Sequence, residues 1–390
     1  MLSRLMHPNL EKSDKLVDTK KKKINKMIDK KASVKDLKQS EDNNMATKNR
    51  ADDILDLIND FRHNKFKSSH EVAIKTEILM EKLISQGQWT TAQELMDLIR
   101  NRIRIFSNAL PEETTPVNIM RHILKVIREE YLDFKSKVEE QQSLQYLVMA
   151  NPEDHAGDYT KPQERLRSAL LNNLTEYKTE LETSVDNIAS QALEHIHSNE
   201  IILTFGKSNT VEQFLKSAAK DRQFQVIVVE AAPNYKGHLM ASNLAKCNIQ
   251  TTIIPDSAVF AMMSRVNKVI IGTHAVMANG GLQAACGAHT IALAAKHYSV
   301  PVMVLVHLYK LSPLYLCSYE QNAFSVCQSP ASVLPQRNGP IVSQVHVYNP
   351  VFDYVPPELV TIFVTHQGGN ASSYIYRLLS ELYHPDDQDL

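Results

Sequence analysis

The residues best suited to hold a phosphate group follow a short apolar run in the second half of the chain. Ile201–Phe205 is followed by Gly206, Lys207 and Ser208, and then by a segment with a helical pattern. Such a loop can bind phosphate, because free N–H groups and the positive end of the helix dipole meet there. The loop matches neither GxxxxGK[ST] nor GxGxxG. A simple strand-to-helix turn is therefore the favoured interpretation.

His274 is the second candidate for chemistry. It follows the apolar run Val269–Ile271 in the segment Gly272-Thr273-His274, where an enzyme built on a parallel sheet keeps functional side chains. The sequence contains no GxSxG or HExxH motif, and its carboxylates are scattered. A lone histidine is more often structural. We therefore predict no catalytic residue, no metal site and no cofactor site.

The cysteines and the hydropathy pattern bear on the compartment. Four cysteines occur in 390 residues, none in a CxxC pair or with zinc-ligand spacing. This usage fits reduced thiols better than a disulfide framework. No apolar segment follows the first residues as in a secretory signal, and no apolar run approaches 18 residues. We expect a soluble, cytoplasmic (cytosolic) protein with no membrane association.

The first 50 residues differ in composition from the rest of the chain. They hold 14 Lys and Arg against 7 Asp and Glu, a net charge of +7, which leaves −8 for the remainder of a chain of net charge −1. They contain no aromatic residue. Such a segment buries too little apolar surface to fold alone, so residues 1–50 are predicted to be a disordered basic extension. RNA binding would call for aromatic residues among the basic ones, so no direct nucleic-acid contact is expected.

Residues 51–195 are predicted to form a helical domain. Only one of the 11 glycines, Gly87, lies before residue 157, and apolar residues recur at helical spacing. Thr91 and Glu94 form a capping box, and Gly87 ends the preceding helix. A linker is expected near residues 143–162, followed by one long connecting helix from about Glu164 to His197.

Residues 196–390 are predicted to form a Rossmann-like domain. Short β-branched runs alternate with helical segments, as in a doubly wound parallel sheet, so the fold class is α+α/β. Thr210 with Gln213 is predicted to cap the first helix of this domain. The expected strands are Ile201–Phe205, Val226–Val229, Thr251–Ile254, Val269–Ile271 and Val302–Val306, and the expected helices are Val211–Ala219, His238–Lys246, Ala258–Arg265 and Ala288–Tyr298.

Several segments resemble the regulatory subunits of translation initiation factor 2B. Residues 199–208, 265–273 and 294–297 are similar to the family as a whole. Residues 349–361 and 373–385 look like its beta branch. So do residues 88–96 and 127–131 of the helical domain. The resemblance covers roughly residues 52–390 and leaves the basic extension outside.

The fold family also includes sugar-phosphate isomerases, such as methylthioribose-1-phosphate isomerase. Those enzymes carry a Cys at the end of the first strand and an Asp after a later strand. The resemblance aligns these positions with Gly206 and His274. Glycine supplies no nucleophile, and a histidine does not replace a carboxylate that is paired with a thiol. The alternative function, a sugar-phosphate isomerase or small-ligand sensor, is therefore disfavoured.

The resemblance implies a non-catalytic scaffold and regulatory subunit of a guanine-nucleotide exchange factor. The implied partners are alpha, gamma, delta and epsilon subunits in a two-fold symmetric decamer, in which epsilon catalyses exchange on initiation factor 2. Phosphorylation of the alpha subunit of initiation factor 2 turns that substrate into an inhibitor.

The resemblance also implies two partner-binding surfaces. Asn172 and Glu176 are expected to face the alpha subunit of initiation factor 2. Four further residues are expected to line the beta–delta interface: Asn199, Gln225, Ile227 and Thr252. The alternatives are a solvated helix face at Glu176 and a buried strand position at Ile227.

Overall fold

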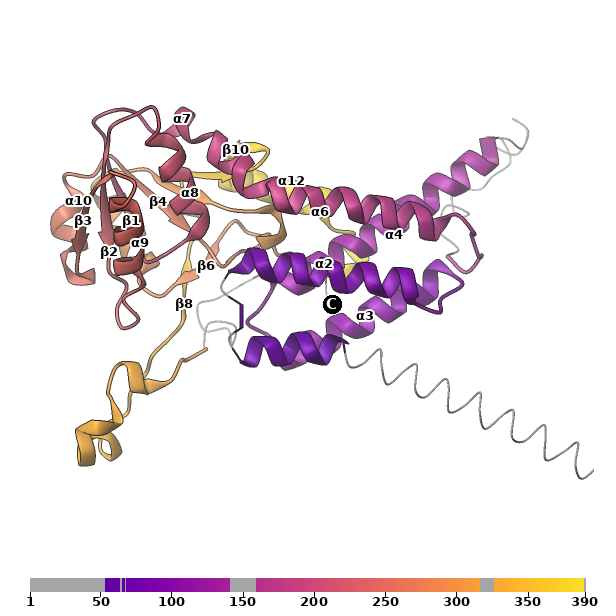
Figure 1. The fold of residues 1–390 in the computed structure, drawn as a ribbon, viewed down its shortest axis with the longest axis horizontal. Helices are drawn as coiled ribbons and strands as arrows, with labels where there is room; N and C mark the ends of the chain where they lie inside the picture. Colours follow the sequence, from indigo (N-terminus) through magenta and orange to yellow (C-terminus); the bar gives the residue numbers. More distant parts are fainter. Residues whose placement is uncertain (1–52, 64, 67, 141–158, 316–325, 389–390) are drawn as a thin grey trace, which may run out of the picture. The chain divides into compact units, whose positions relative to one another are not determined.

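The computed structural model describes residues 53–63, 65–66, 68–140, 159–315 and 326–388 (Figure 1). The chain divides into two compact units, Met1–Asn59 and Asp60–Leu390. In the first unit, residues 53–59 are helical. The predicted basic extension and residues 143–158 of the predicted linker lie outside the described residues. The second unit contains the helices and strands named below.

Three long helices come first in the second unit: α2 (Ser69–Gln86), α3 (Ala92–Ala109) and α4 (Thr115–Glu140). The side chain of Ser68 caps α2. Thr91 and Glu94 form the predicted capping box at the start of α3, and Gly87 follows the last residue of α2 as predicted. Because side chains satisfy the first N–H groups of α2 and α3, each of these helices begins at a defined residue.

The long connecting helix is interrupted where the sequence predicts one continuous helix. The structure has α6 (Leu166–Ser190) and then the short α7 (Ala192–His195). At Gln191 the N–H donates to the carbonyl of Ile188, so the turn tightens there. The Gln191 side chain donates to the Thr365 carbonyl at 2.8 Å, which ties the break to the sheet.

The seven-stranded sheet has the order β10-β9-β7-β4-β1-β2-β3, and all its neighbouring strands are parallel except β9 and β10. This confirms the α+α/β fold class. Its strands are β1 (Ile201–Phe205), β2 (Gln225–Val229), β3 (Gln250–Ile254), β4 (Lys268–Gly272), β7 (Val302–Leu305), β9 (Ile362–Thr365) and β10 (Gly368–Asn370). Helices α8 (Asn209–Ala218), α9 (Lys236–Ala245), α10 (Val259–Met263) and α11 (Ala288–His297) connect the first five.

A second, antiparallel sheet has no counterpart in the sequence prediction. It has the order β5-β6-β8, from β5 (Ala275–Val276), β6 (Leu282–Ala285) and β8 (Phe352–Val355). The last α-helix of the described residues is α12 (Ile375–Leu382). The described 3₁₀ turns are η2 (Asp256–Ala258), η3 (Leu308–Lys310), η5 (Pro330–Ser332), η6 (Gln336–Ser343), η7 (Pro357–Leu359), η8 (Ser372–Tyr374) and η9 (Pro385–Asp387).

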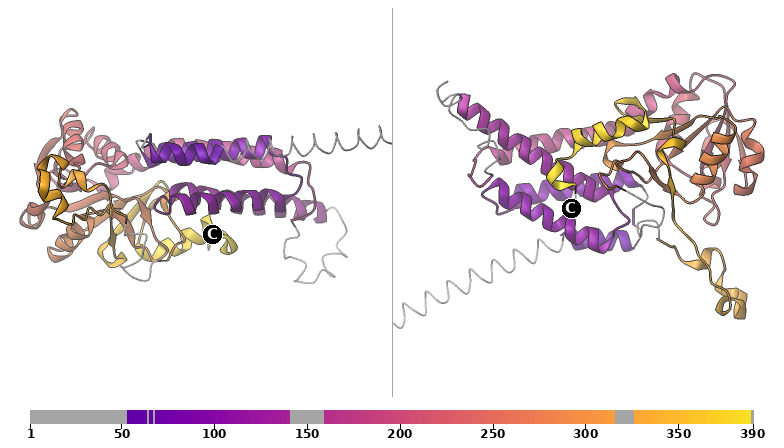
Figure 2. Two further views of the ribbon diagram at one scale, coloured as in Figure 1. Left: turned by 90° about the horizontal axis from the view of Figure 1, so that it is seen from below. Right: turned by 180° about the vertical axis from the view of Figure 1, so that it is seen from behind.

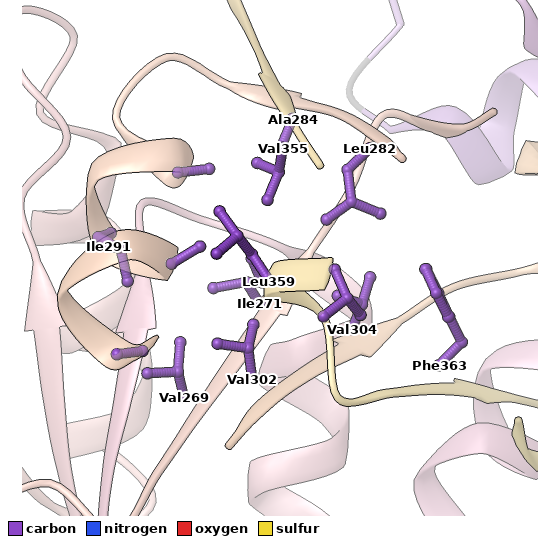
Figure 3. Packing of buried hydrophobic residues seen from close by; sticks show 14 of the residues in the cluster. Val269, Ile271, Leu282, Ala284, Ile291, Val302, Val304, Val355, Leu359 and Phe363 are labelled. Carbon is purple, nitrogen blue, oxygen red and sulfur yellow. The ribbon is translucent and has the colours of Figure 1, made fainter. Parts of the chain in front are cut away.

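Alternate residues of each central strand point to opposite faces of the large sheet, and both faces are buried. One face packs against α8 and α9 through residues such as Ile202 and Val226. The other packs against α10, α11 and the small sheet (Figure 3). This second core contains Val269, Ile271 and Val304.

The predicted cap of α8 is wrong. The side chain of Ser208, and not that of Thr210, accepts from the N–H of Val211 at the start of the helix. The Thr210 hydroxyl instead lies 2.9 Å from Nε2 of His307, a buried residue after β7. A long-range partner for the threonine thus replaces the local capping bond.

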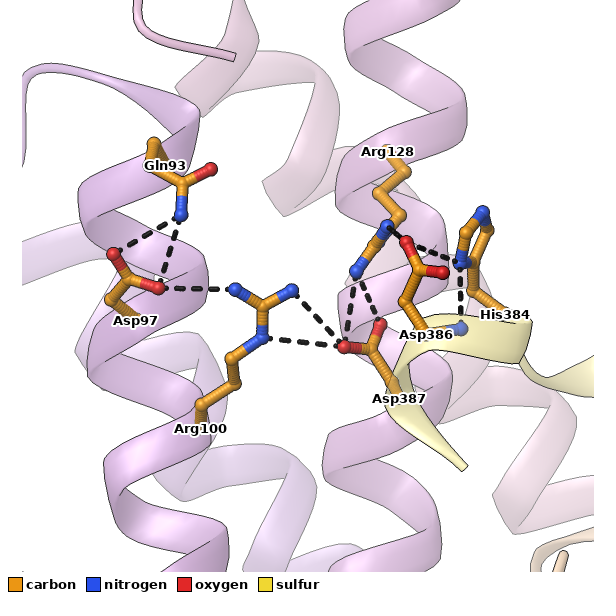
Figure 4. Close-up of polar contacts among 7 residues, drawn as sticks. All are labelled: Gln93, Asp97, Arg100, Arg128, His384, Asp386 and Asp387. Carbon is orange, nitrogen blue, oxygen red and sulfur yellow. Dashed lines mark hydrogen bonds and ion pairs between the residues drawn. The ribbon is translucent and has the colours of Figure 1, made fainter. Parts of the chain in front are cut away.

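The 3₁₀ turn η9, at the end of the described chain, contacts α3 and α4 through ion pairs (Figure 4). We call the four residues of these pairs the C-terminal latch: Arg100, Arg128, Asp386 and Asp387. The Asp387 carboxylate is fully buried and lies 3.2 Å from Arg100 Nη2 and 2.9 Å from Arg128 Nη2. Asp386, which is largely exposed, pairs with Arg128 Nη1 at 2.9 Å. The views in Figure 2 show the yellow C-terminal segment beside the violet helices.

Candidate functional site

The topological switch point of the sheet lies between β1 and β4, where the strand order reverses. Ligands of doubly wound sheets bind at the carboxyl ends of such strands. Gly206 follows β1 there with a positive φ of 58°, and a Cβ built on Gly272 would lie 2.6 Å from Ser208 Oγ. The loop after β1 and the end of β4 are therefore packed directly against each other.

Three titratable side chains fill the carboxyl ends of β4 and β7. The Lys310 ammonium donates to the Thr273 carbonyl at 2.9 Å. His274 Nε2 lies 3.6 Å from the Glu113 carboxylate, which comes from the connection between α3 and α4. His274 Nε2 also lies 3.2 Å from the carbonyl of the residue before Glu113. This cluster joins the helices to the sheet at the place where a sheet enzyme would bind its substrate.

Burial sets the protonation of this cluster. It raises the pKa of Glu113 to about 7, with Lys310 opposing the rise. It lowers the pKa of Lys310 to about 8 and, with the Lys310 charge, lowers the pKa of His274 to about 4. Glu113 does not stabilise a protonated His274. With a pKa of about 7, Glu113 is already protonated and uncharged near pH 4, where His274 would gain its proton. At neutral pH His274 is neutral, and the ionic attraction runs between Glu113 and Lys310.

A thiol and a carboxylate do meet elsewhere in the sheet domain. Cys286 follows β6, and Asp353 of β8 accepts from the N–H groups of Gly287 and His289 at the start of α11. Burial first, and then the Asp353 carboxylate, raise the pKa of the Cys286 thiol to about 11. A thiol with that pKa is protonated at neutral pH and is a poor nucleophile.

The structure places three of the four predicted beta–delta residues on one face of the sheet, at its edge. Strand β3 is one of the two edge strands of the described sheet, with β10 at the other edge, and Ile227 of β2 pairs in register with Thr252 of β3. Gln225, two residues before Ile227, points to the same face. Asn199 lies just before β1 with a φ of 65°, and its N–H donates to the Gln223 carbonyl at 2.8 Å.

We call these four residues the edge surface. Asn199, Gln225 and Thr252 are exposed, whereas the Ile227 side chain is only 5% exposed and belongs to the core. Ile227 thus supports this surface from beneath.

Asn172 and Glu176 lie one turn apart on α6 and are both exposed. The opposite side of α6 is buried through Leu170, Leu174 and Leu181. We call these two residues the α6 surface. They are well separated in sequence from the edge surface. Together they form a second exposed face, with one carboxylate and one amide.

Sequence reasoning missed an exposed aromatic side chain on the sheet face that carries Thr252. Phe260 of α10 is 52% exposed and contacts the rings of His297 and Tyr298, with centroid distances of 5.1 and 5.2 Å. The helical spacing of the sequence could have predicted this exposure. Val259 and Met263, at positions i and i+4, form the buried side of α10, and Phe260 lies off that side.

Among the described residues, no group of three or more His, Cys, Asp or Glu side chains could hold a metal ion. Likewise, no described helix is both long and apolar enough to cross a membrane.

The chain matches the model of the initiation factor 2 subunit family over residues 65–372. The chain therefore belongs to this family and is a translation initiation factor subunit. Within the family, its similarity runs along most of the length of beta subunits. Translation initiation factor eIF2B subunit beta of Dictyostelium discoideum is 43% identical, covering 82% of this chain and 92% of the relative. Its Schizosaccharomyces pombe counterpart is 36% identical, covering 86% and 96%.

Solved structures show the same similarity. The tetrameric eIF2B-beta2-delta2 complex of Chaetomium thermophilum contains a chain that superimposes with a TM-score of 0.64 at 26% identity, covering 85% of this chain and 94% of that one. A more distant relative, ribose 1,5-bisphosphate isomerase of Pyrococcus furiosus, is 22% identical and covers 81% of this chain and 90% of the relative.

Proposed function

We propose that this chain is a non-catalytic scaffold and regulatory subunit of the guanine-nucleotide exchange factor for initiation factor 2. The observation that carries the proposal is the similarity to eIF2B beta subunits along more than four fifths of the chain. A structural neighbour is a complex of two beta and two delta subunits. We infer the same kind of assembly here, with alpha, gamma and epsilon subunits completing a two-fold decamer.

The edge surface supports a role in assembly with a delta subunit. An outermost strand offers unpaired backbone groups to a partner, and stable complexes bury such edges. Ile253 of β3, on the opposite face from Thr252, is 45% exposed and adds apolar area at the same edge. A partner that covers β3 would remove both from water.

The α6 surface supports contact with the alpha subunit of initiation factor 2. Glu176 offers an exposed carboxylate to basic side chains, and Asn172 adds an amide that both donates and accepts. A phosphate group on that alpha subunit adds negative charge and acceptor oxygens. The phosphorylated alpha subunit would therefore bind a different, basic surface of the assembly. Binding at that surface turns initiation factor 2 from a substrate into an inhibitor.

The switch point supports a scaffold role over catalysis. Gly206 offers no side chain, and the imidazole of His274 is largely buried and is neutral at pH 7. The Cys286 thiol has a raised pKa. In the proposed complex, the exchange reaction belongs to the epsilon subunit.

The test is to co-express the tagged chain with the other four subunits of its own organism and to measure the mass of the purified complex. A two-fold decamer that releases GDP from initiation factor 2 is the expected result. A chain that recovers no other subunit contradicts the proposal.

The isomerase relative supplies the alternative function. Incubation of the purified chain with ribose 1,5-bisphosphate, followed by product analysis, tests it directly. Turnover that disappears in a His274→Ala variant would favour the isomerase, and we expect no turnover.

A further inference from the structure

Serine or threonine precedes proline at three positions of the chain: Thr115-Pro116, Ser312-Pro313 and Ser329-Pro330. This dipeptide is the minimal sequence that proline-directed protein kinases recognise. Phosphorylation of a serine or threonine adds negative charge and strong acceptor oxygens to the site. A kinase must reach the hydroxyl group, so the burial of each side chain decides which of the three can be modified.

Burial separates the three positions. Thr115, the first residue of α4, is 1% exposed, and Ser312 is fully buried. Ser329 is exposed, and so is every residue from 327 to 333. A bound kinase contacts residues on both sides of the hydroxyl, and of the three positions Ser329 is the one that offers such an exposed stretch.

Ser329 lies at the base of a segment that we call the arm, residues 326–351. The two ends of the arm pair with each other, since Val351 N–H donates to the Val326 carbonyl at 3.0 Å. The Val351 carbonyl in turn accepts from Cys286 N–H at 3.0 Å, next to the small sheet. Ser329 is therefore held at a fixed place on the folded core without being covered by it.

The local geometry leaves the Ser329 hydroxyl available. Its backbone angles, φ −52° and ψ 131°, are near those of an extended polyproline II segment. The hydroxyl accepts from Ala331 N–H at 3.3 Å and donates in none of the hydrogen bonds of the described residues. The neighbouring Ser332 hydroxyl, in contrast, donates to the Ser329 carbonyl at 3.2 Å and accepts from the Asn349 amide at 2.9 Å.

The residues around Ser329 restrict the class of kinase. Pro330 has a ring and no N–H, so the enzyme must accept an apolar side chain there without a backbone donor. No Asp or Glu occurs from Gln321 to Phe352, and no Lys or Arg occurs from Leu311 to Gln336. Kinases that select their substrate by nearby acidic or basic residues therefore find no recognition element.

We propose that Ser329 is a phosphorylation site for a proline-directed serine/threonine kinase. In this reaction Ser329 Oγ attacks the γ-phosphorus of Mg·ATP, the bond from that phosphorus to the β–γ bridging oxygen breaks, and ADP leaves. The hydroxyl proton passes to the catalytic carboxylate of the kinase. The proposal goes beyond the proposed function and does not depend on it, because all the residues that carry it belong to this chain.

The phosphate reverses the sign of the charge of the arm. The arm has one Arg, Arg337, with no Lys, Asp or Glu, so its net charge is +1 with histidine neutral. A phosphoserine adds about −1.5 to −2 at neutral pH. The modified arm therefore carries a net charge of about −0.5 to −1.

The first experiment uses the purified full chain, a mitogen-activated protein kinase as the proline-directed enzyme, and ATP labelled in the γ-phosphate. Proteolysis and mass spectrometry should locate the label at Ser329. Pro330→Ala keeps the hydroxyl but should lower the initial rate of labelling roughly tenfold or more, because the proline is the recognition element. The matched control Ser332→Ala removes an exposed hydroxyl of the same turn and should keep the rate within about twofold of wild type.

Two results of this experiment would overturn the proposal. One is a kinase that labels a standard serine–proline peptide but leaves Ser329 of the chain unlabelled. The other is an undiminished rate in Pro330→Ala. Circular dichroism melting should show the wild-type fold in both variants, because Pro330 and Ser332 are exposed.

The second experiment asks whether the modification occurs in the cell. The tagged full chain is recovered from its own organism in the presence of phosphatase inhibitors, and the peptide that contains Ser329 is analysed by mass spectrometry. We expect a phosphorylated fraction of this peptide, which should disappear in the Pro330→Ala variant expressed in the same way. Recovery of the wild-type peptide in its unphosphorylated form alone contradicts the proposal.

Discussion

At the scale of single residues, titratable side chains from three segments of the chain lie near the switch point of the sheet. The resemblance to sugar-phosphate isomerases aligns Gly206 and His274 with the thiol and the carboxylate of those enzymes. The structure has here a partly buried cluster of His274, Glu113 and Lys310 that connects helices to sheet.

The His274 imidazole gives a pH dependence with a definite sign. Its folded pKa of about 4 lies below the ordinary value of 6.5, so the unfolded chain binds this proton first. The contribution of neutral His274 to stability is present above about pH 6.5 and is lost as the pH falls toward 4. The loss amounts to at most ~3 kcal/mol.

A His274→Gln variant should therefore lose less stability than wild type between pH 7 and pH 4.5. Urea unfolding of both proteins at several pH values measures the difference. Glu113 shifts in the opposite sense, since its raised pKa stabilises the folded state as the pH falls below 7. Glu113 is present in both proteins, so a pH-independent difference between them would contradict the role given to His274.

Glu176 gives a second prediction at this scale. Replacement by Lys on the exposed α6 surface should weaken binding of the alpha subunit of initiation factor 2 roughly tenfold, or ~1.4 kcal/mol, because it puts a like charge opposite basic side chains. Asp186→Lys, an equal charge change at another exposed position of α6, is the control. Both variants should unfold at the wild-type temperature.

At the scale of elements, η9 is attached to α3 and α4 by the C-terminal latch. Arg128 is 5% exposed at its side chain and Asp387 is fully buried, so neither charge is well solvated. Removing one partner of a buried ion pair leaves the other charge uncompensated, at a cost of about 3–5 kcal/mol. Exposed pairs contribute only about 0–1 kcal/mol.

Asp387→Asn should therefore destabilise the protein by about 3 kcal/mol or more. Asp386→Asn, one residue away and largely exposed, should cost less than about 1 kcal/mol. Guanidinium unfolding of the two variants side by side measures both. Similar losses from the two would show that burial is not what makes the latch strong.

The elements also show which parts of the fold the sequence predicts and which it leaves out. The strands β1 to β4 and β7 and the helices that connect them are predicted by the spacing and type of their apolar residues. They occur within a few residues of their predicted bounds. Asn279–Gly281 has the composition of a tight turn, and Met277 N–H does donate to the Gly281 carbonyl at 2.8 Å. The strands flanking it were missed, because β5 has only two residues and β6 pairs with the distant β8.

The candidate site likewise has features that the sequence predicts and features that only the folded structure shows. Gln225 and Thr252 lie on recognisable strands, so their shared face follows from the strand period once the sheet order is known. The contacts of Glu113 with His274, and of Asp387 with Arg100, join residues far apart in the sequence. No periodicity signals such pairs, and they required the folded structure.

At the scale of the whole molecule, we expect the edge surface to decide whether the chain is stable alone or only when it is bound to a delta subunit. Thr252→Arg places a charge on the exposed outer strand without disturbing the core. It should abolish co-purification with the delta subunit and leave the secondary structure unchanged. Pull-down and circular dichroism measure the two effects. Ile227→Ala is the wrong probe, since a cavity at this buried residue costs stability of its own.

The latch also has a consequence for how the protein is made. Asp387 follows Arg100 by 287 residues, so at about 5–20 residues per second its synthesis trails that of the helix by roughly 14–57 seconds. During that interval the Arg100 guanidinium lacks the Asp387 carboxylate, its partner in the finished fold. Helices α3 and α4 thus reach their final set of contacts only after almost all of the described chain has been synthesised.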